Sequence, residues 1–162
     1  MNSIRIIPYR KDDRDRVIDL ALRAWSPAFA VARTRVPAYV HRAFYPNGWQ
    51  VRQIEDIGRL LDSAPQNVLL AYVGGDLVGF VGTRLRPADS LGEIRMLAAA
   101  PDSQPVETER ALMKAAEDLF RRAGMAIAMV ETSGDAGESP ARDIYAALGY
   151  ESTQVLRRFK PL

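Results

Sequence analysis

The 162-residue sequence has no cysteine and a single histidine. The lack of cysteine excludes disulfides, thiolate metal sites and a cysteine nucleophile, and it fits a reducing compartment. His41, the one histidine, lies in an arginine-containing amphipathic segment, and we interpret it as a structural or surface residue. We therefore expect no metal site, and we find neither a P-loop nor a nucleophile elbow.

A charge excess and a long apolar run are also missing. The 22 Lys and Arg residues against 20 Asp and Glu residues give a net charge of +2 and are interleaved, unlike the basic stripe of a nucleic-acid-binding protein. No apolar stretch reaches the roughly 20 residues that span a bilayer. The first residues quickly turn polar, unlike a signal peptide. We expect a soluble, cytoplasmic protein that contacts neither nucleic acid nor membrane.

The sequence does contain a regular succession of strand and helix patterns. Gly74-Gly75 separates two apolar runs, which predicts a β-hairpin in the middle of a sheet that helices cover on both faces. Pro27 is expected to bend or end the first helix, and a loop is expected at 133–137. The predicted strands are 4–8, 68–73, 77–83, 93–99, 126–130 and 150–159, and the predicted helices are 12–26, 36–44, 54–64, 107–122 and 139–148.

Four local patterns agree with the order of these elements. Ala141 to Tyr150 reads A-x-x-x-Y-x-x-x-G-Y, Leu97 to Pro101 is an alanine-rich strand that ends at proline, Gln104 opens a loop, and Ala111-Leu112-Met113 begins the apolar stripe of a long helix. In this order and at these lengths, the segment 68–162 resembles the GCN5-related N-acetyltransferase (GNAT) superfamily.

The resemblance implies a single GNAT-type domain over residues 1–162, of α+β (three-layer α/β) class. A mixed, mostly antiparallel sheet of 6–7 strands would carry helices on both faces. Residues 1–65 would form the variable acceptor side and 66–162 the acyl-CoA-binding core. The implied activity is transfer of an acetyl or acyl group from acetyl-CoA, as co-substrate, to a primary amine of a small molecule or peptide by direct attack. Because dimers are the default for soluble oligomers, a homodimer is the association to test.

Two residues stand at the family's catalytic positions. Tyr145 takes the place of the general acid, and a phenol with an ordinary pKa of about 10 stays protonated at neutral pH. The alternative is a core tyrosine with a bonded hydroxyl. Glu93 stands where some members place a general base that accepts a proton through water. The alternatives are an exposed strand end or a salt bridge to a nearby arginine.

The resemblance also implies a donor site. Backbone groups of Leu97, Ala98 and Ala99 would bind the pantetheine arm, although the same alanines would equally suit a strand packed tightly against a helix. The loop and the first turns of the helix after it would hold the pyrophosphate. The residues at those positions are Gln104, Pro105, Val106, Glu107, Thr108, Glu109 and Arg110.

This loop departs from the family motif Q/R-x-x-G-x-G/A. Glu107 and Glu109 replace both glycines, and Pro105 has no N–H to donate. Two carboxylates would repel a diphosphate, at about 1 kcal/mol for each like-charge pair ~4 Å apart in water. Alternatively, the acids stabilise an empty helix N-terminus. Two hypotheses therefore stay open: an acetyltransferase with altered donor binding, and a GNAT-fold binding or regulatory module without the usual acetyl-CoA binding.

The acceptor side is rich in aromatic residues. Most of these rings should pack in the core, and one or two would line a pocket for the acceptor amine. The five residues are Trp25, Tyr39, Phe44, Tyr45 and Trp49.

Overall fold

The computed structural model describes residues 3–131 and 139–162, so the loop predicted at 133–137 lies outside the described residues. Five strands form one sheet in the order β1-β2-β3-β4-β5. The first four are antiparallel to their neighbours, and β5 runs parallel to β4. Their bounds are β1 Ile4–Pro8, β2 Val68–Val73, β3 Asp76–Arg86, β4 Leu91–Ala99 and β5 Ile127–Val130.

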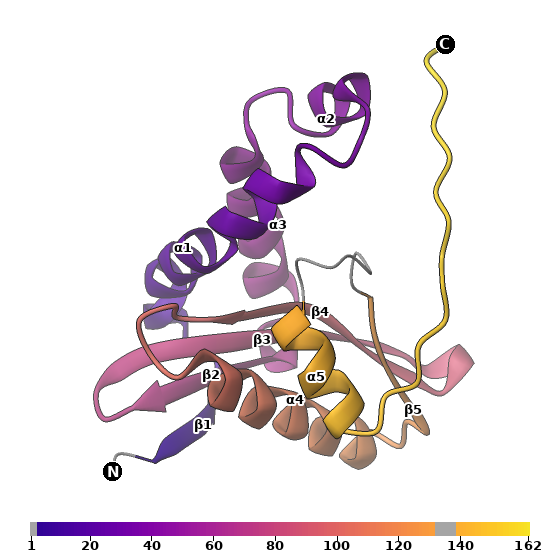
Figure 1. The fold of residues 1–162 in the computed structure, drawn as a ribbon. Coiled ribbons are helices and arrows are strands. Elements are labelled where there is room, and N and C mark those ends of the chain that lie inside the picture. The colour runs from indigo at the N-terminus through magenta and orange to yellow at the C-terminus, as the bar shows by residue number, and fades with distance from the viewer. Residues whose placement is uncertain (1–2, 132–138) are drawn as a thin grey trace.

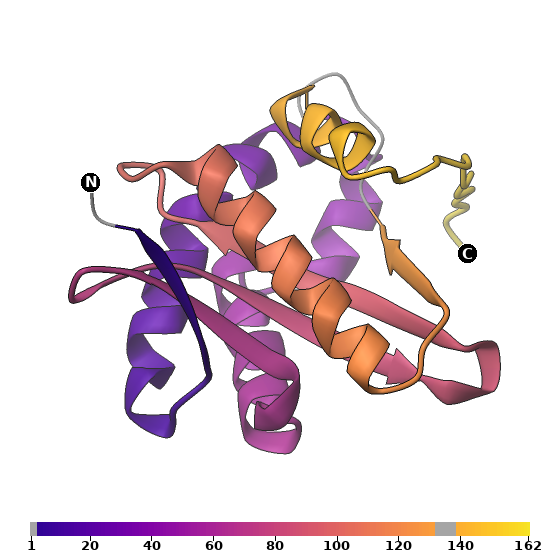
Figure 2. The same ribbon diagram turned by 90° about the horizontal axis from the view of Figure 1, so that it is seen from below.

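Helices cover both faces of this sheet, which confirms the predicted three-layer class (Figure 1). Helices α1 and α3 lie on one face, and α4 crosses the other face with α5 beside it (Figure 2). Short 3-10 turns at Lys11–Asp13, Pro65–Asn67 and Pro87–Asp89 connect elements. The helices are α1 Arg14–Ala32, α2 Ala38–Phe44, α3 Trp49–Ser63, α4 Pro105–Arg122 and α5 Ser139–Ala147. Among the described residues, none of the helices combines the length and apolar character needed to cross a bilayer.

Each face of the sheet has its own hydrophobic core. Val17, Leu20 and Ala21 of α1 pack with Phe80 and other sheet residues on one face. On the opposite face the core consists of sheet residues together with the buried stripe of α4. The α4 residues in that second core are Leu112, Met113, Ala116 and Phe120. The continuous apolar strands are buried on both faces of the sheet, and the helical stripe of α4 is buried on one side, as the sequence predicts.

Two glycines let α4 lie unusually close to the sheet. A Cβ atom at Gly92 would come within 2.2 Å of the Phe120 ring, and one at Gly79 would come within 2.7 Å of Thr108 Cγ2. Any larger residue would push the helix outward at one end or the other. The position of the N-terminal turns of α4 above β3 and β4 is therefore fixed by glycine in the sheet.

Two predictions about chain segments need correction. Pro27 does not end helix α1, which continues to Ala32, because a proline removes one backbone hydrogen bond without preventing the helix from continuing; the expected bend at Pro27 stays a prediction. The strand predicted at 150–159 is absent: residues 151–162 form no regular element and are exposed, with Val155 and Leu156 at 72% and 74%. This missing strand explains why the described sheet has five strands rather than six or seven.

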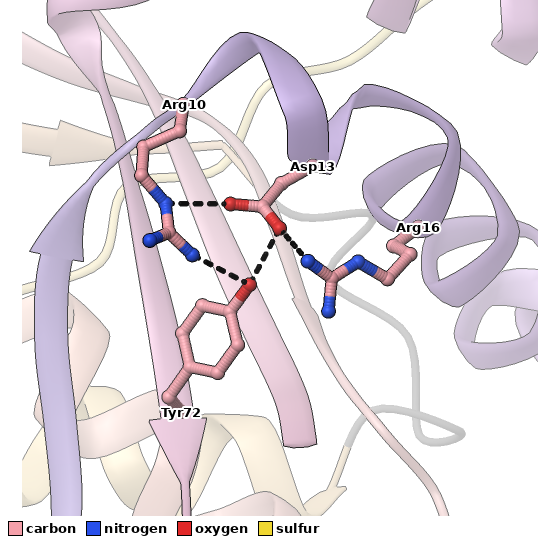
Figure 3. Close-up of polar contacts among 4 residues, drawn as sticks. All are labelled: Arg10, Asp13, Arg16 and Tyr72. Carbon is pink, nitrogen blue, oxygen red and sulfur yellow. Dashed lines mark hydrogen bonds and ion pairs between the residues drawn. The ribbon is translucent and has the colours of Figure 1, made fainter. Parts of the chain in front are cut away.

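A buried carboxylate joins the start of α1 to the sheet (Figure 3). Asp13 is fully buried, and it accepts hydrogen bonds from the Tyr72 hydroxyl at 2.6 Å, from Arg10 Nε at 3.0 Å and from Arg16. Burial opposes ionisation, but the hydrogen bonds from Tyr72 and Arg10 outweigh it, so the pKa of Asp13 lies below its ordinary value. The ionised carboxylate is thus satisfied on both oxygens, as a buried charge requires.

Replacement of Tyr72 by phenylalanine should destabilise the protein. The change leaves the buried Asp13 carboxylate short of one donor, at a cost of about 1–3 kcal/mol in the free energy of unfolding. Urea denaturation measures this loss. Tyr39→Phe is the matched control, because no described residue bonds the Tyr39 hydroxyl, and it should change stability by less than about 0.5 kcal/mol. Equal effects of the two variants would contradict this account of Asp13.

Candidate functional site

Strand β4 has one edge that is only half paired. It pairs with β3 from Leu91 to Ala99, but with β5 only from Leu91 to Ile94, opposite Ile127 to Val130. A β-bulge falls at the end of this paired stretch, because Gly82 and Thr83 of β3 face Met96 and Ile94 and leave Arg95 as an extra residue. Within residues 3–131 and 139–162, no strand pairs with the second half of β4 on the β5 side.

The hydrogen-bond pattern shows which backbone groups lie along this unpaired stretch. The Ala100 N–H donates to the Val78 carbonyl at 2.7 Å, across the β3 side. Since backbone groups of an antiparallel strand alternate in direction, Ala98 faces β3 in the same way, and Leu97 and Ala99 face away from β3. We call the outward N–H and C=O groups of Leu97 and Ala99 the open edge of β4.

The alanine side chains at the end of β4 and directly after it are part of the core. Ala98 and Ala100 are 2% and 4% exposed and pack in the cluster that contains Val17, Leu20 and Ala21 of α1. Their small size therefore allows α1 to approach the sheet closely, which was one of the two predicted interpretations. The other interpretation, that backbone groups of this strand bind the pantetheine arm, is compatible with the open edge and stays a prediction.

One contact at the open edge was missed by the sequence analysis. The indole Nε1–H of Trp25, in α1, donates a hydrogen bond of 3.0 Å to the carbonyl of Leu97. The sequence alone predicts Trp25 only as a core or acceptor-side aromatic residue. A bond between residues 72 positions apart has no local sequence signal, and it appears only when α1 is placed over β4.

The predicted phosphate loop leads into the N-terminus of α4. Helix α4 begins at Pro105, and the side chain of its N-cap residue, Gln104, makes no capping hydrogen bond. Glu107 is exposed in the first turn, where its negative charge interacts favourably with the positive end of the helix dipole. Of the remaining predicted residues, Val106 is half-buried and Arg110 is exposed.

Thr108 is fully buried against the sheet, and its Oγ1 has no hydrogen-bond partner among the described residues. Its methyl group instead fills the space above Gly79. Thr108 therefore fixes the position of the helix end.

Glu109 lies in the second turn of α4, which begins at Pro105, whereas the predicted helix start at residue 107 would put it in the first turn. It stands one turn before the fully buried Met113, on the side of α4 that faces the sheet, and it is half-buried. Burial raises the pKa of the Glu109 carboxyl above its ordinary value. Favourable interaction with the helix N-terminus thus accounts for Glu107 but does not account for Glu109.

The two predicted catalytic residues, Tyr145 and Glu93, lie in helix α5 and strand β4, respectively. Tyr145 of α5 is half-buried in the core on the α4 face, next to Tyr150, with 6.2 Å between ring centroids. Burial and then the neighbouring Glu117 carboxylate raise the pKa of Tyr150.

Glu93 is 9% exposed, within the paired part of β4, and its Oε1 lies 3.7 Å from Nη1 of Arg95. Glu93 is therefore neither an exposed nor a terminal strand residue.

The aromatic residues of the first third form a cluster among α1, α2 and α3. Phe29 stacks on Trp49 at 4.3 Å and meets Tyr45 edge-on at 5.8 Å. His41 lies 5.1 Å from the Tyr45 ring, which fits the structural role that the sequence predicts. Phe44 is 40% exposed and contacts Phe159 of the C-terminal segment at 6.0 Å.

Two cavities lie outside the predicted donor residues. One, of about 580 Å³, lies between α1, the β2–β3 turn and the residues after β4. The other, of about 430 Å³, lies between the end of α4, β5 and residues 148–151. Neither is lined by Leu97, Ala99 or Glu109.

Solved structures with this fold include several acetyltransferases. The PaiA N-acetyltransferase from Thermoplasma acidophilum, in complex with coenzyme A, is 16% identical with a TM-score of 0.66, over 94% of this chain and 92% of that one. The aminoglycoside N-acetyltransferase AAC(6')-Iy, in complex with CoA, is 13% identical with a TM-score of 0.65, over 99% and 96%. The aminoglycoside acetyltransferase meta-AAC0020 from an uncultured soil metagenomic sample, in complex with sisomicin, is 18% identical with a TM-score of 0.63, over 98% and 96%.

At these identities the structural likeness establishes the fold alone. The model of the acetyltransferase (GNAT) family matches residues 22–150, most of the chain. The chain therefore belongs to the GNAT acetyltransferase family, which confirms the resemblance read from the sequence. No curated protein matches the sequence.

The raised pKa of Glu109 predicts a pH-dependent stability difference. A carboxyl whose pKa is higher in the folded state binds its proton more tightly there, so the charged form costs stability as the pH rises through that pKa. Glu109→Gln should therefore raise the Tm at pH 7 by about 2–4 °C, and the gain should disappear as the pH falls to about 4. Thermal melts at several pH values measure it.

Glu107→Gln is the matched control for this experiment. It removes the same charge from an exposed position in the first turn of α4, and it should leave the Tm unchanged or slightly lower. A Glu109→Gln variant no more stable than wild type at pH 7 would contradict the burial argument.

Proposed function

We propose that this protein is an N-acetyltransferase that transfers the acetyl group of acetyl-CoA to a primary amine of a small molecule. The observation that carries the proposal is the open edge of β4. The pantetheine arm of CoA contains two amides, and they can pair with the outward groups of Leu97 and Ala99 as a neighbouring strand would. Membership of the GNAT family and the likeness to acetyltransferases solved with CoA support the proposal.

The reaction proposed is direct transfer. The neutral amine attacks the thioester carbonyl carbon, a C–N bond forms, and the C–S bond breaks to release the thiolate of CoA. The hydroxyl of Tyr145 gives its proton to that thiolate. The proton lost by the amine nitrogen passes through water to Glu93. The products are the N-acetylated amine and CoA with a free thiol.

Glu93 suits the base role by its position in β4. It lies two residues before the bulge at Arg95 and near the point where β5 stops pairing. Arg95 is 3.7 Å away, so a second charge is available to hold the carboxylate in place. Glu93 thus lies on the strand that would carry the donor, four residues before Leu97.

Donor binding in this proposal depends mainly on the pantetheine arm. At the pyrophosphate end, Pro105 offers no N–H, and Glu107 and Glu109 bring two negative charges to the turns that would face the phosphates. The half-buried position of Glu109 is the specific observation that favours a second candidate, a GNAT-fold binding or regulatory module that does not use acetyl-CoA. A test of donor binding separates the two candidates.

We propose the class of acceptor from the solved structures that share this fold. Two of the structures compared above are named as aminoglycoside acetyltransferases, and one of them holds sisomicin, a small molecule with several primary amines. Sisomicin is therefore a suitable first acceptor in an assay, together with a panel of simple primary amines.

Acetyl-CoA should stabilise the protein against thermal unfolding. At about 100 times the Kd, binding adds about 2.7 kcal/mol to the free energy of unfolding. Calorimetry should further show that a Glu107→Gln/Glu109→Gln double variant binds acetyl-CoA at least about fivefold more tightly, because two charges near the diphosphate are removed.

Glu55→Gln, in α3, is the control for loss of charge alone, and it should leave the Kd unchanged. The absence of any shift in Tm at millimolar acetyl-CoA would support the binding-module candidate instead. Unchanged affinity in the double variant would contradict the account of the loop.

Tyr145→Phe should lower turnover without changing donor affinity. Loss of a general acid lowers kcat by about 10²–10⁴-fold. The measurement is release of the CoA thiol with sisomicin or an amine from the panel, next to a calorimetric Kd for acetyl-CoA. Tyr150→Phe is the matched control, because it removes a neighbouring buried hydroxyl and should keep full turnover. A Tyr145→Phe enzyme that works at the wild-type rate would remove Tyr145 from the mechanism.

A further inference from the structure

The indole of Trp25 occupies one of the hydrogen-bonding positions of the open edge. Its Nε1–H lies 3.0 Å from the carbonyl oxygen of Leu97, a normal distance for an N–H···O bond. That carbonyl faces away from β3, into the space where a neighbouring strand would place its own N–H donor. Trp25 therefore stands in for the backbone N–H of a missing partner.

A pantetheine amide would need the same position. An extended ligand that pairs with β4 donates its amide N–H to an outward carbonyl and accepts from an outward N–H. At Leu97 the indole already bonds that carbonyl, and the ring occupies space in front of it. The arm and the indole thus compete for one acceptor.

We propose that Trp25 is an intramolecular latch on the acyl-donor site, which acetyl-CoA must displace from the Leu97 carbonyl in order to bind. This inference rests on the proposed function. It assigns to Trp25 a regulatory effect on donor affinity, separate from the effect of Glu107 and Glu109 at the other end of the ligand. The latch keeps the edge of β4 satisfied while the donor is absent, because a backbone carbonyl without a partner is costly.

The surroundings of Trp25 allow the indole to be both held and released. On one side its ring contacts Phe80, a fully buried core residue, with 6.1 Å between ring centroids. The Trp25 side chain is only half-buried, and Ser26 and Pro27 after it are exposed. Trp25 thus packs at the margin of the core, and displacement of the indole uncovers its contact with Phe80.

The helix that carries Trp25 is weakened at this point. Pro27 has no N–H, so the carbonyl of Arg23, four residues earlier, receives no helical hydrogen bond from it. The turn of α1 between Arg23 and Pro27 contains Trp25 and lacks one of its backbone bonds. A small adjustment of this turn would move the indole without unwinding the buried first half of α1.

Trp25→Phe tests the latch directly. Phenylalanine keeps an aromatic ring against Phe80 but cannot donate to the Leu97 carbonyl. The expected result, by isothermal calorimetry, is a Kd for acetyl-CoA about two- to tenfold lower than that of wild type, the range that one hydrogen bond accounts for. Trp49→Phe is the matched control, since Trp49 stacks on Phe29 away from β4, and its Kd should equal that of wild type.

Each outcome of this comparison has a distinct meaning. If wild type binds acetyl-CoA and Trp25→Phe binds equally well or less well, the latch is overturned while the proposed function stands. If Trp49→Phe also binds more tightly, the effect is a general loosening of the α1–α3 cluster, and the latch is overturned. If neither wild type nor Trp25→Phe binds at millimolar acetyl-CoA, the proposed function and the latch both fail.

A spectroscopic measurement tests the latch without changing Trp25. In Trp49→Phe, Trp25 is the only remaining tryptophan, because the chain has two. Saturation with CoA should shift its fluorescence emission to longer wavelength, as the indole leaves the Leu97 carbonyl for a more solvated position. An emission maximum that does not change at saturating CoA would overturn the proposal even if the Trp25→Phe variant failed to fold.

Discussion

The candidate donor site depends on strand β4, which, within the part of the chain that the structure describes, pairs with two strands along its first half and with only one along its second half. The first half of β4 is hydrogen-bonded on both edges, and the second half, beyond the bulge at Arg95, keeps its bonds to β3 alone. The antiparallel bonds to β3 fix which backbone groups of that second half point outward. The roles considered for Leu97, Ala99, Glu93 and Trp25 all follow from this half-paired strand.

Much of the architecture could be predicted from the sequence because its signals are local. Gly74-Gly75 between two apolar runs predicts the hairpin, and the stripe around Leu112 and Phe120 predicts α4. The last strand could not be predicted correctly, because a segment such as Val155 to Phe159, with two arginines between apolar residues, forms a strand only if a sheet edge pairs with it, and residues 151–162 have no such pairing. Pro27 likewise does not end α1, since a helix can continue after the loss of one backbone hydrogen bond.

The site was less predictable than the fold. Motif positions pointed to Tyr145 and Leu97 through family resemblance, and the replacement of two loop glycines was visible in the sequence. The sheet-facing direction of Glu109 could also be predicted from its spacing to Leu112 and Met113, but the sequence prediction considered only its distance from the helix N-terminus. The bond from Trp25 to Leu97 links two distant elements and has no sequence pattern at all.

The close seating of α4 has a mechanical consequence for this site. With Phe120 pressed onto Gly92 at one end and Thr108 onto Gly79 at the other, the helix can neither tilt nor slide toward the sheet. Helix α4 is therefore a rigid wall next to the open edge of β4. Room for a bulky ligand would then have to come from a shift of the short strand β5 or of the Trp25 indole.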